Sequence, residues 1–103
     1  MNKLRNCHAR IPGEYLLNGM VKEVGKSAYI LYTILALHQD WQTYTCFPSQ
    51  KTITKLTGMD HKTIKKAVDV LVEKHYITSL EYRKPLDKDG KEYGKKRYYY
   101  TIR

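Results

Sequence analysis

The chain has 103 residues, enough for one domain with one hydrophobic core and too few for two. Its 19 Lys and Arg against 10 Asp and Glu give a net charge of +9, which favours a polyanionic partner or an anionic surface. No apolar run approaches the roughly 20 residues that span a bilayer, and the N-terminus lacks the apolar region of a signal peptide. We therefore expect a cytoplasmic protein with no membrane partner.

The positive charge is concentrated in the second half of the sequence. Residues 48–77 contain six basic and three acidic side chains, and residues 78–103 contain eight basic and four acidic ones. Residues 25–47 sum to zero, and the first 24 residues supply the remaining +2. We expect the binding elements in this basic second half.

The N-terminal segment divides at a turn. Residues 1–14 are polar and basic and contain Pro12-Gly13, so they are interpreted as an N-terminal arm. Residues 15–103 are expected to form a single domain. Apolar residues at helical spacing predict one short helix that ends at Gly25. These residues are Leu16, Leu17, Met20, Val21 and Val24.

A central core helix is predicted next. Residues 28–40 are apolar around more than half of a helical circumference, and Ser27 is expected to cap their start. His38, near the end, is interpreted as a C-terminal helix cation or a surface side chain. Thr45 to Phe47 can form a short strand before Pro48.

Two capped helices follow, separated by a glycine turn. Ser49 caps a short helix, QKTITKLT, in which Ile53 and Leu56 are expected to face inward. Gly58 ends this helix, because a left-handed conformation costs glycine little. Asp60 caps the second helix.

The second helix has an apolar side and a charged side. The apolar stripe, about 100° wide, consists of Ile64, Ala67, Val68, Leu71 and His75. The other side carries Lys62, Lys66, Asp69 and Glu73, flanked by Thr63 and Lys65. A lysine-rich face alone is usually just solvated, so the significance of these charges depends on the neighbouring elements.

The C-terminal segment predicts a β-hairpin, or wing, over residues 77–102. Residues 77–83 and 97–102 are rich in β-branched and aromatic side chains, as strands are. The polar segment between them contains the turn formers Pro85, Asp89-Gly90 and Gly94. Its many cations are typical either of a DNA-contacting wing or of a solubilising loop.

Three consecutive tyrosines, Tyr98 to Tyr100, lie in the second wing strand. They raise the alternative of RNA or single-stranded DNA stacked on aromatic rings. Alternation places Tyr98 and Tyr100 on one face, which must pack on the helices. We therefore interpret them as core residues with their hydroxyl groups at the rim.

The order of these elements resembles the winged helix-turn-helix fold over about residues 26–103. The resemblance is strongest from Pro48 to Ile77 and is to the N-terminal domains of plasmid and phage replication initiators and to GntR-type bacterial regulators. The matching positions are Pro48-Ser49, Ile53, Leu56, Gly58, Thr63-Ile64 and Tyr76-Ile77. His61-Lys62 and His75-Tyr76 depart from the family pattern, so the base preference of relatives does not transfer.

The resemblance implies an α+β fold with three core helices, a C-terminal β-hairpin wing and a short extra N-terminal helix. Residues 49–74 would form the helix-turn-helix. Together with the charge, it implies a double-stranded DNA-binding protein, with recognition helix 60–74 in the major groove and the basic wing on the backbone. The expected DNA-binding residues are Ser49, Gln50, Lys51, His61, Lys62, Thr63, Lys65, Lys66, Arg83, Lys84, Lys88, Lys91, Lys95, Lys96 and Arg97.

Two biological roles stay open for a protein of bacterial or mobile-element origin. It would be a transcriptional regulator, or an accessory factor in plasmid replication or conjugation. A homodimer would use the N-terminal helices or the first core helix, and no small-molecule effector domain is expected. The alternatives are a winged-helix protein-interaction module and a single-stranded nucleic-acid binder that uses tyrosines.

No catalytic constellation is apparent, so we do not expect an enzyme. The sequence lacks a Gly-rich phosphate loop, an HExxH motif and paired carboxylates in an apolar setting. Cys7 and Cys46 are expected to be reduced thiols, with Cys46 in the core. Because Cys7-His8 has no further ligand at metal-site spacing, neither a metal nor another cofactor is expected.

Overall fold

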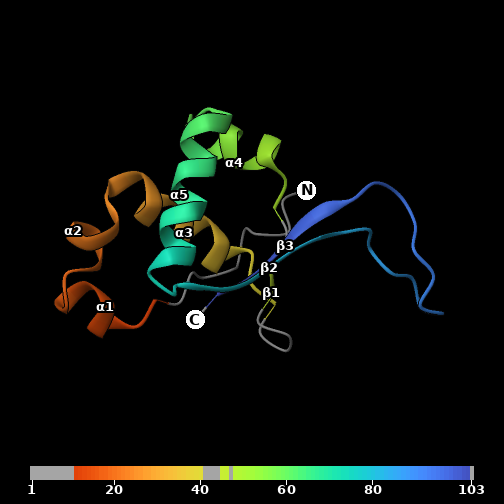
Figure 1. The fold of residues 1–103 in the computed structure, drawn as a ribbon, viewed down its shortest axis with the longest axis horizontal. Coiled ribbons are helices and arrows are strands. Elements are labelled where there is room, and N and C mark those ends of the chain that lie inside the picture. Colours follow the sequence, from red (N-terminus) through yellow and green to blue (C-terminus); the bar gives the residue numbers. More distant parts are fainter. Residues whose placement is uncertain (1–10, 41–44, 47, 103) are drawn as a thin grey trace.

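The computed structural model describes residues 11–40, 45–46 and 48–102, which form helices and a three-stranded antiparallel sheet. The elements are α1 (Gly13–Leu17), α2 (Met20–Val24), α3 (Lys26–Leu37), β1 (Thr45–Cys46), α4 (Gln50–Thr57), α5 (His61–Glu73), β2 (Ile77–Arg83) and β3 (Arg97–Ile102). The helices cluster at one end, and the β2–β3 hairpin extends away from them (Figure 1). This arrangement confirms the α+β, winged helix-turn-helix fold.

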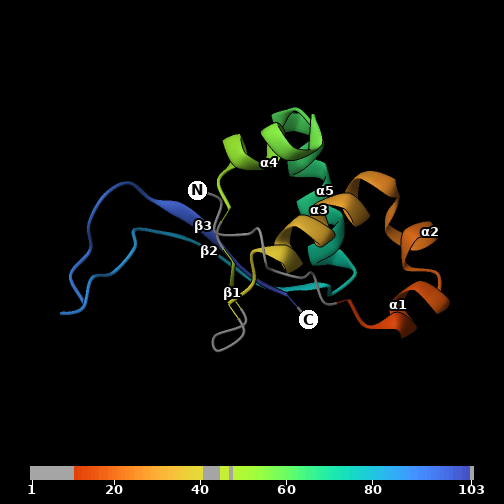
Figure 2. The same cartoon turned by 180° about the vertical axis from the view of Figure 1, so that it is seen from behind.

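Strand β3 is the centre of the sheet, in the order β1-β3-β2. Directly opposed residues of an antiparallel pair share a face, and faces alternate along each strand. One face therefore carries Leu80, Tyr82, Tyr98 and Tyr100, and the other carries Glu81, Arg83, Arg97 and Tyr99. The view from behind shows the outer part of the hairpin clear of all helices (Figure 2). Phe47, expected in the first strand, lies outside the described residues.

The hydrophobic core lies where α3, α5 and the sheet meet. Helix α3 is the central helix predicted from its composition, and its Leu31, Tyr32 and Leu35 are fully buried. Cys46 is buried as expected, and burial raises the pKa of its thiol to about 12. The thiol therefore stays protonated and packs as a small apolar group. Cys7 lies outside the described residues.

The N-terminal segment forms two helices where the sequence predicted one. Gly19 separates α1 from α2, because its φ of 85° is left-handed and interrupts the helical path. The expected cap of α3 is also wrong, since Gly25 occupies the N-cap position and Ser27 lies inside the helix. Helix α1 begins at Gly13, ahead of the expected domain boundary, and residues 1–10 of the expected arm lie outside the description.

Three tyrosines attach these N-terminal helices to the core. The rings of Tyr15, Tyr32 and Tyr76 meet edge to face, with centroid distances of 5.3, 5.9 and 6.3 Å. Such pairs add about 0.5–1.5 kcal/mol each beyond the area they bury. The Tyr76 hydroxyl also donates to Glu23 Oε1 at 3.1 Å, which ties α2 to the end of α5.

The helix-turn-helix has the caps that the sequence predicted. The Thr52 N–H donates to Ser49 Oγ at 3.1 Å, and the Thr63 N–H donates to Asp60 Oδ1 at 2.8 Å. Gly58 ends α4 with a φ of 77°. Each cap satisfies a backbone group that has no partner within its helix, so the turn geometry follows from local chemistry.

Two inward-facing residues were predicted wrongly in this unit. Ile53 is fully buried, but Leu56 is 52% exposed, because only one side of the short α4 contacts the other helices. His75 was expected on the apolar stripe, but α5 ends at Glu73 and His75 is exposed with a φ of 65°.

His75 is part of the hydrogen-bonded end of α5. The Tyr76 N–H donates to the Leu71 carbonyl at 2.9 Å, and the His75 N–H donates to the Val72 carbonyl at 3.1 Å. This is the Schellman pattern, in which glycine is the usual left-handed residue. A histidine there strains the backbone, since its Cβ crowds the following carbonyl.

Replacing this histidine by glycine should therefore stabilise the fold. We expect His75→Gly to raise the free energy of unfolding by about 0.5–1 kcal/mol, because glycine adopts the left-handed conformation without steric cost. Urea unfolding followed by circular dichroism measures the change. His75→Ala, which removes the ring and keeps the Cβ, is the matched control and should give no such gain. A loss of stability in His75→Gly would contradict the strain argument.

The cap of α5 should make stability depend on pH. The hydrogen bond from the Thr63 N–H lowers the pKa of Asp60 below its ordinary value of 3.8. A carboxyl with a lowered folded-state pKa stabilises the fold above its unfolded pKa, and this contribution is lost as the pH falls through the folded pKa. Asp60→Asn keeps a cap oxygen but does not titrate. We expect the stability difference between wild type and Asp60→Asn to shrink on acidification from about pH 6 to about pH 2. A difference that is constant across this range would contradict the assignment.

Candidate nucleic-acid interface

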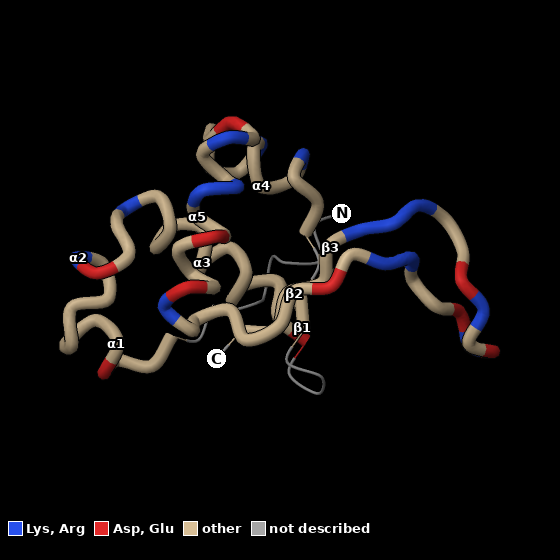
Figure 3. The backbone as a smooth tube through the Cα atoms, viewed as in Figure 1, with Lys and Arg blue, Asp and Glu red and all other residues tan. Residues whose placement is uncertain are grey.

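The first half of α5 presents a basic surface opposite its buried stripe. Ile64, Ala67, Val68 and Leu71 face the core. The exposed side carries His61, Lys62, Lys65 and Lys66, while Thr63 is half-buried. Basic positions follow the upper part of α5, and acidic positions lie below them (Figure 3). The cations expected on this helix thus lie together near its N-terminus.

Asp60 modifies the anion-binding character of that N-terminus. Helix N-termini attract anions through free N–H groups and the positive end of the dipole. Here the Asp60 carboxylate already accepts the Thr63 N–H and sits near His61 and Lys66, both of which help lower its pKa. Because this negative charge occupies the cap, a nucleic-acid phosphate would be met mainly by lysine side chains.

The start of α4 borders the root of the wing. A shallow cleft between them is lined by His38, Pro48, Ser49, Thr52, Lys95, Lys96 and Arg97. It brings the expected site residue Ser49 beside three expected wing cations, although α5 and β2 separate them in the sequence. His38, Pro48 and Thr52 were not predicted in the site, although Thr52 shares α4 with the predicted residues Gln50 and Lys51. Nothing local indicates that His38, at the end of α3, meets the wing.

The tip of the wing is organised by Asp87. Its Oδ1 accepts the N–H groups of Asp89 and Lys91, both at 2.9 Å, and Gly90 adopts a φ of 81°. Lys88 and Lys91 are exposed around this turn. The tip therefore carries its cations beside carboxylates, whereas Lys95 to Arg97 form an uninterrupted basic run at the root.

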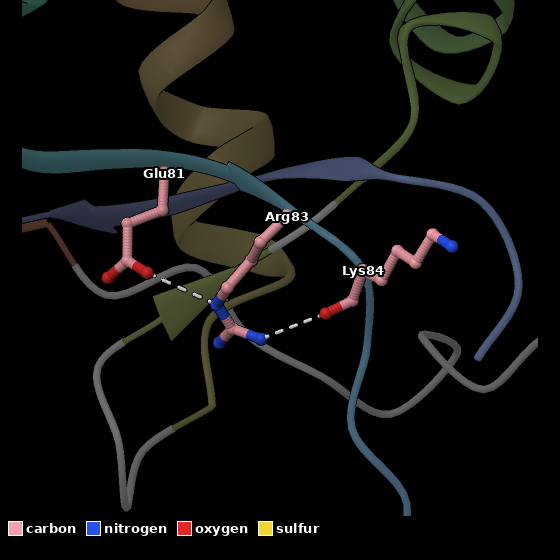
Figure 4. Close-up of polar contacts among 3 residues, drawn as sticks. All are labelled: Glu81, Arg83 and Lys84. Atoms are coloured by element: carbon pink, nitrogen blue, oxygen red, sulfur yellow. Dashed lines mark hydrogen bonds and ion pairs between the residues drawn. The ribbon is translucent and has the colours of Figure 1, made fainter. Parts of the chain in front are cut away.

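Arg83 lies on the face of the sheet away from α5. Its Nε donates to Glu81 Oε2 at 3.1 Å, its Nη1 donates to the Lys84 carbonyl at 3.3 Å, and its Cζ lies 3.9 Å from the Tyr99 ring centroid. Figure 4 shows the Lys84 side chain directed away from this cluster. The structure thus separates Arg83 from the basic surface of α5, and the ion pair offsets part of its charge.

The face toward α5 carries an exposed aromatic strip. Tyr100 is 2% exposed, as predicted for a core tyrosine, but Tyr98 is 39% exposed, so the expectation that it packs in the core is wrong. Tyr82, opposite Tyr98, is 56% exposed. The helices of the described chain leave both rings partly exposed, and the two rings lie against each other with centroids 4.6 Å apart.

Gln50 and Lys65 stand at the inner end of this strip. They border a cleft between α5 and the sheet that is completed by Ile64, Val68, Asp69, Leu80, Tyr98 and Tyr100. Lys51 is exposed one residue farther along α4. Tyr82 and Tyr98 were absent from the predicted DNA-binding residues, because alternation along a strand does not show which part of a sheet face the helices cover.

The described residues were also compared with what a metal site and a membrane-spanning helix require. They contain no group of three or more His, Cys, Asp or Glu side chains placed to hold a metal ion. In the same part of the chain, every helix is too short or too polar to serve as a membrane span.

A family model described as a helix-turn-helix domain matches residues 23–77, more than half of the chain. The match covers α3, α4 and α5 and ends at the first residue of β2. No curated protein and no solved structure matches the chain significantly. The matched segment contains the capped helix pair and its basic face, and this domain indicates DNA binding. The chain belongs to the helix-turn-helix domain family.

Proposed function

We propose that the protein binds double-stranded DNA, with the first half of α5 in the major groove and the wing on the adjacent backbone. The observation that carries the proposal is the exposed basic run of α5, which lies opposite the stripe that packs on the core. A helix with side chains is about 10–12 Å across and fits a major groove about 12 Å wide.

The charge gradient along α5 supports entry by its N-terminal half. Lys62, Lys65 and Lys66 occupy the first two turns, whereas Asp69 and Glu73 follow on the exposed side. Carboxylates repel phosphates, so the second half of the helix would lie outside the groove. Asp69, at the boundary, is in a position to accept a hydrogen bond from the amino group of a cytosine.

The root of the wing supports a second contact with the backbone. Lys95, Lys96 and Arg97 border the same cleft as Ser49, at the start of α4. Contacts of this kind go mainly to phosphates, so they position the protein and carry little sequence information. Lys88 and Lys91 would add contacts at the wing tip.

In biological terms, we propose a regulator of transcription or an accessory factor in plasmid replication or conjugation, acting in the cytoplasm by binding rather than by catalysis. Selection of bound duplexes from a random pool tests whether the protein recognises a particular DNA sequence, as these roles require. A consensus sequence would support an operator or origin, and a palindromic consensus would support a homodimer. No binding to any duplex at low salt would favour a protein-interaction module instead.

Two lysines of α5 give the sharpest test of the interface. We expect Lys62→Ala and Lys66→Ala each to weaken duplex binding and to reduce the slope of log K against log salt by about one unit. Fluorescence anisotropy at several salt concentrations measures both quantities.

Lys22→Ala, at an exposed lysine on α2 that is outside the expected DNA-binding residues, is the matched control and should leave the slope unchanged. If the Lys62 and Lys66 double variant kept the affinity and slope of the wild type, α5 would not be the recognition helix.

A further inference from the structure

The exposed rings of Tyr82 and Tyr98, named here the tyrosine platform, are not explained by duplex binding alone. We propose that this platform stacks an unpaired base of DNA, so that the protein binds a duplex flanked by a single-stranded segment more tightly than a fully paired one. The inference rests on the proposed function, since α5 would hold the paired part.

The geometry of the platform suits stacking. The two ring centroids lie 4.6 Å apart and the planes meet at 39°, so the rings leave much of their surface open. Tyr100 extends the row toward the core, 6.2 Å from Tyr98 and inclined by 30°. Exposed aromatic faces in a row are the feature by which proteins bind successive bases of a single strand.

The platform leads into the cleft beside α5. This cleft has a volume of about 170 Å³ and an apolar wall from Ile64, Val68 and Leu80. Pockets for drug-sized ligands are usually about 300–1,000 Å³, so this cleft by itself is too small for such a ligand. Gln50, Lys65 and Asp69 line the cleft with amide, ammonium and carboxylate groups, the types that hydrogen-bond base edges.

The charges around the platform favour a nucleotide over an apolar peptide. Lys96 Nζ lies 5.9 Å from the Tyr82 ring centroid. A second cleft, lined by Pro48, Ser49, Gln50, Lys96 and Arg97, borders both rings. Lys65 stands at the opposite end, so cations flank the rings on both sides along the path that a phosphate backbone would follow. Among the residues that line these two clefts, the cations Lys65, Lys96 and Arg97 outnumber the single carboxylate, Asp69.

The base that occupies the platform must already be unpaired. Extruding a base from an intact duplex breaks its pairing and stacking. The free energy that this costs is comparable to the free energy that stacking on one aromatic ring contributes. A fully paired duplex would therefore gain little from the platform. A strand that continues past the end of the duplex gains the stacking without that cost.

The test compares a blunt duplex with the same duplex carrying a five-nucleotide single-stranded extension. We expect the extended DNA to bind wild-type protein about fivefold to tenfold more tightly. Tyr82→Ala should abolish this ratio, and Tyr98→Ala should do the same. Tyr82→Phe keeps the ring and should keep the ratio. Thermal unfolding confirms that each variant is folded. Because Tyr82 is 56% exposed, its substitutions should disturb the fold less than Tyr98→Ala does.

The outcomes separate this inference from the proposed function. The stacking role of the platform would be wrong if the wild type bound both DNAs with equal affinity, or if Tyr82→Ala weakened binding to both DNAs equally. Either result would leave the proposal of duplex binding intact. If the Lys62 and Lys66 double variant bound both DNAs as tightly as wild type while Tyr82→Ala still removed the preference, α5 would lose its role and the platform would stand.

Discussion

The packing of α5 against α3 is the interaction on which the rest of the structure depends. Leu31 and Leu35 of α3 and Ile64 and Leu71 of α5 are at most 1% exposed in the shared core. Burying each such side chain stabilises the fold by about 1.5–3 kcal/mol. Because the apolar stripe of α5 is held inward, the side that carries its lysines must face solvent. The position of the basic surface is thus a consequence of the core.

The same core fixes the sheet and the N-terminal helices. Tyr100 and Ile102 of β3 are buried with α3 and α5, so the central strand is anchored at its C-terminal end while the hairpin leaves the core at the other. Tyr76, directly before β2, contacts Tyr15 and Tyr32 and donates to Glu23. The left-handed residue His75 turns the chain from α5 toward β2.

The fold divides the charged side chains among basic, acidic and mixed surfaces. The start of α5 and the root of the wing are basic, the second half of α5 carries carboxylates, and the tip of the wing mixes both signs. On the far face of the sheet, Arg83 is held by Glu81 and by the Tyr99 ring. Net charge alone would treat all these cations as equivalent, whereas their faces and partners differ.

The sequence by itself determined the features that depend on neighbours along the chain. The caps at Ser49 and Asp60, the glycine stop of α4 and the wing strands follow from local hydrogen bonding, backbone freedom and alternation. The helix-turn-helix and its basic face could be predicted for the same reason. The sequence could not show that Gly19 divides the N-terminal helix, since a glycine within apolar periodicity is compatible with one helix or two.

Only the tertiary structure decided which side chains have something to pack against. Leu56 and Tyr98 have the spacing of core residues but lie where the neighbouring elements end, so both are exposed. The cleft that joins Ser49 to the wing cations exists because β3 runs past the start of α4. Burial and proximity depend on contacts between segments far apart in the chain, which local periodicity does not encode. The surface next to α5, including the tyrosine platform, is therefore a property of the fold.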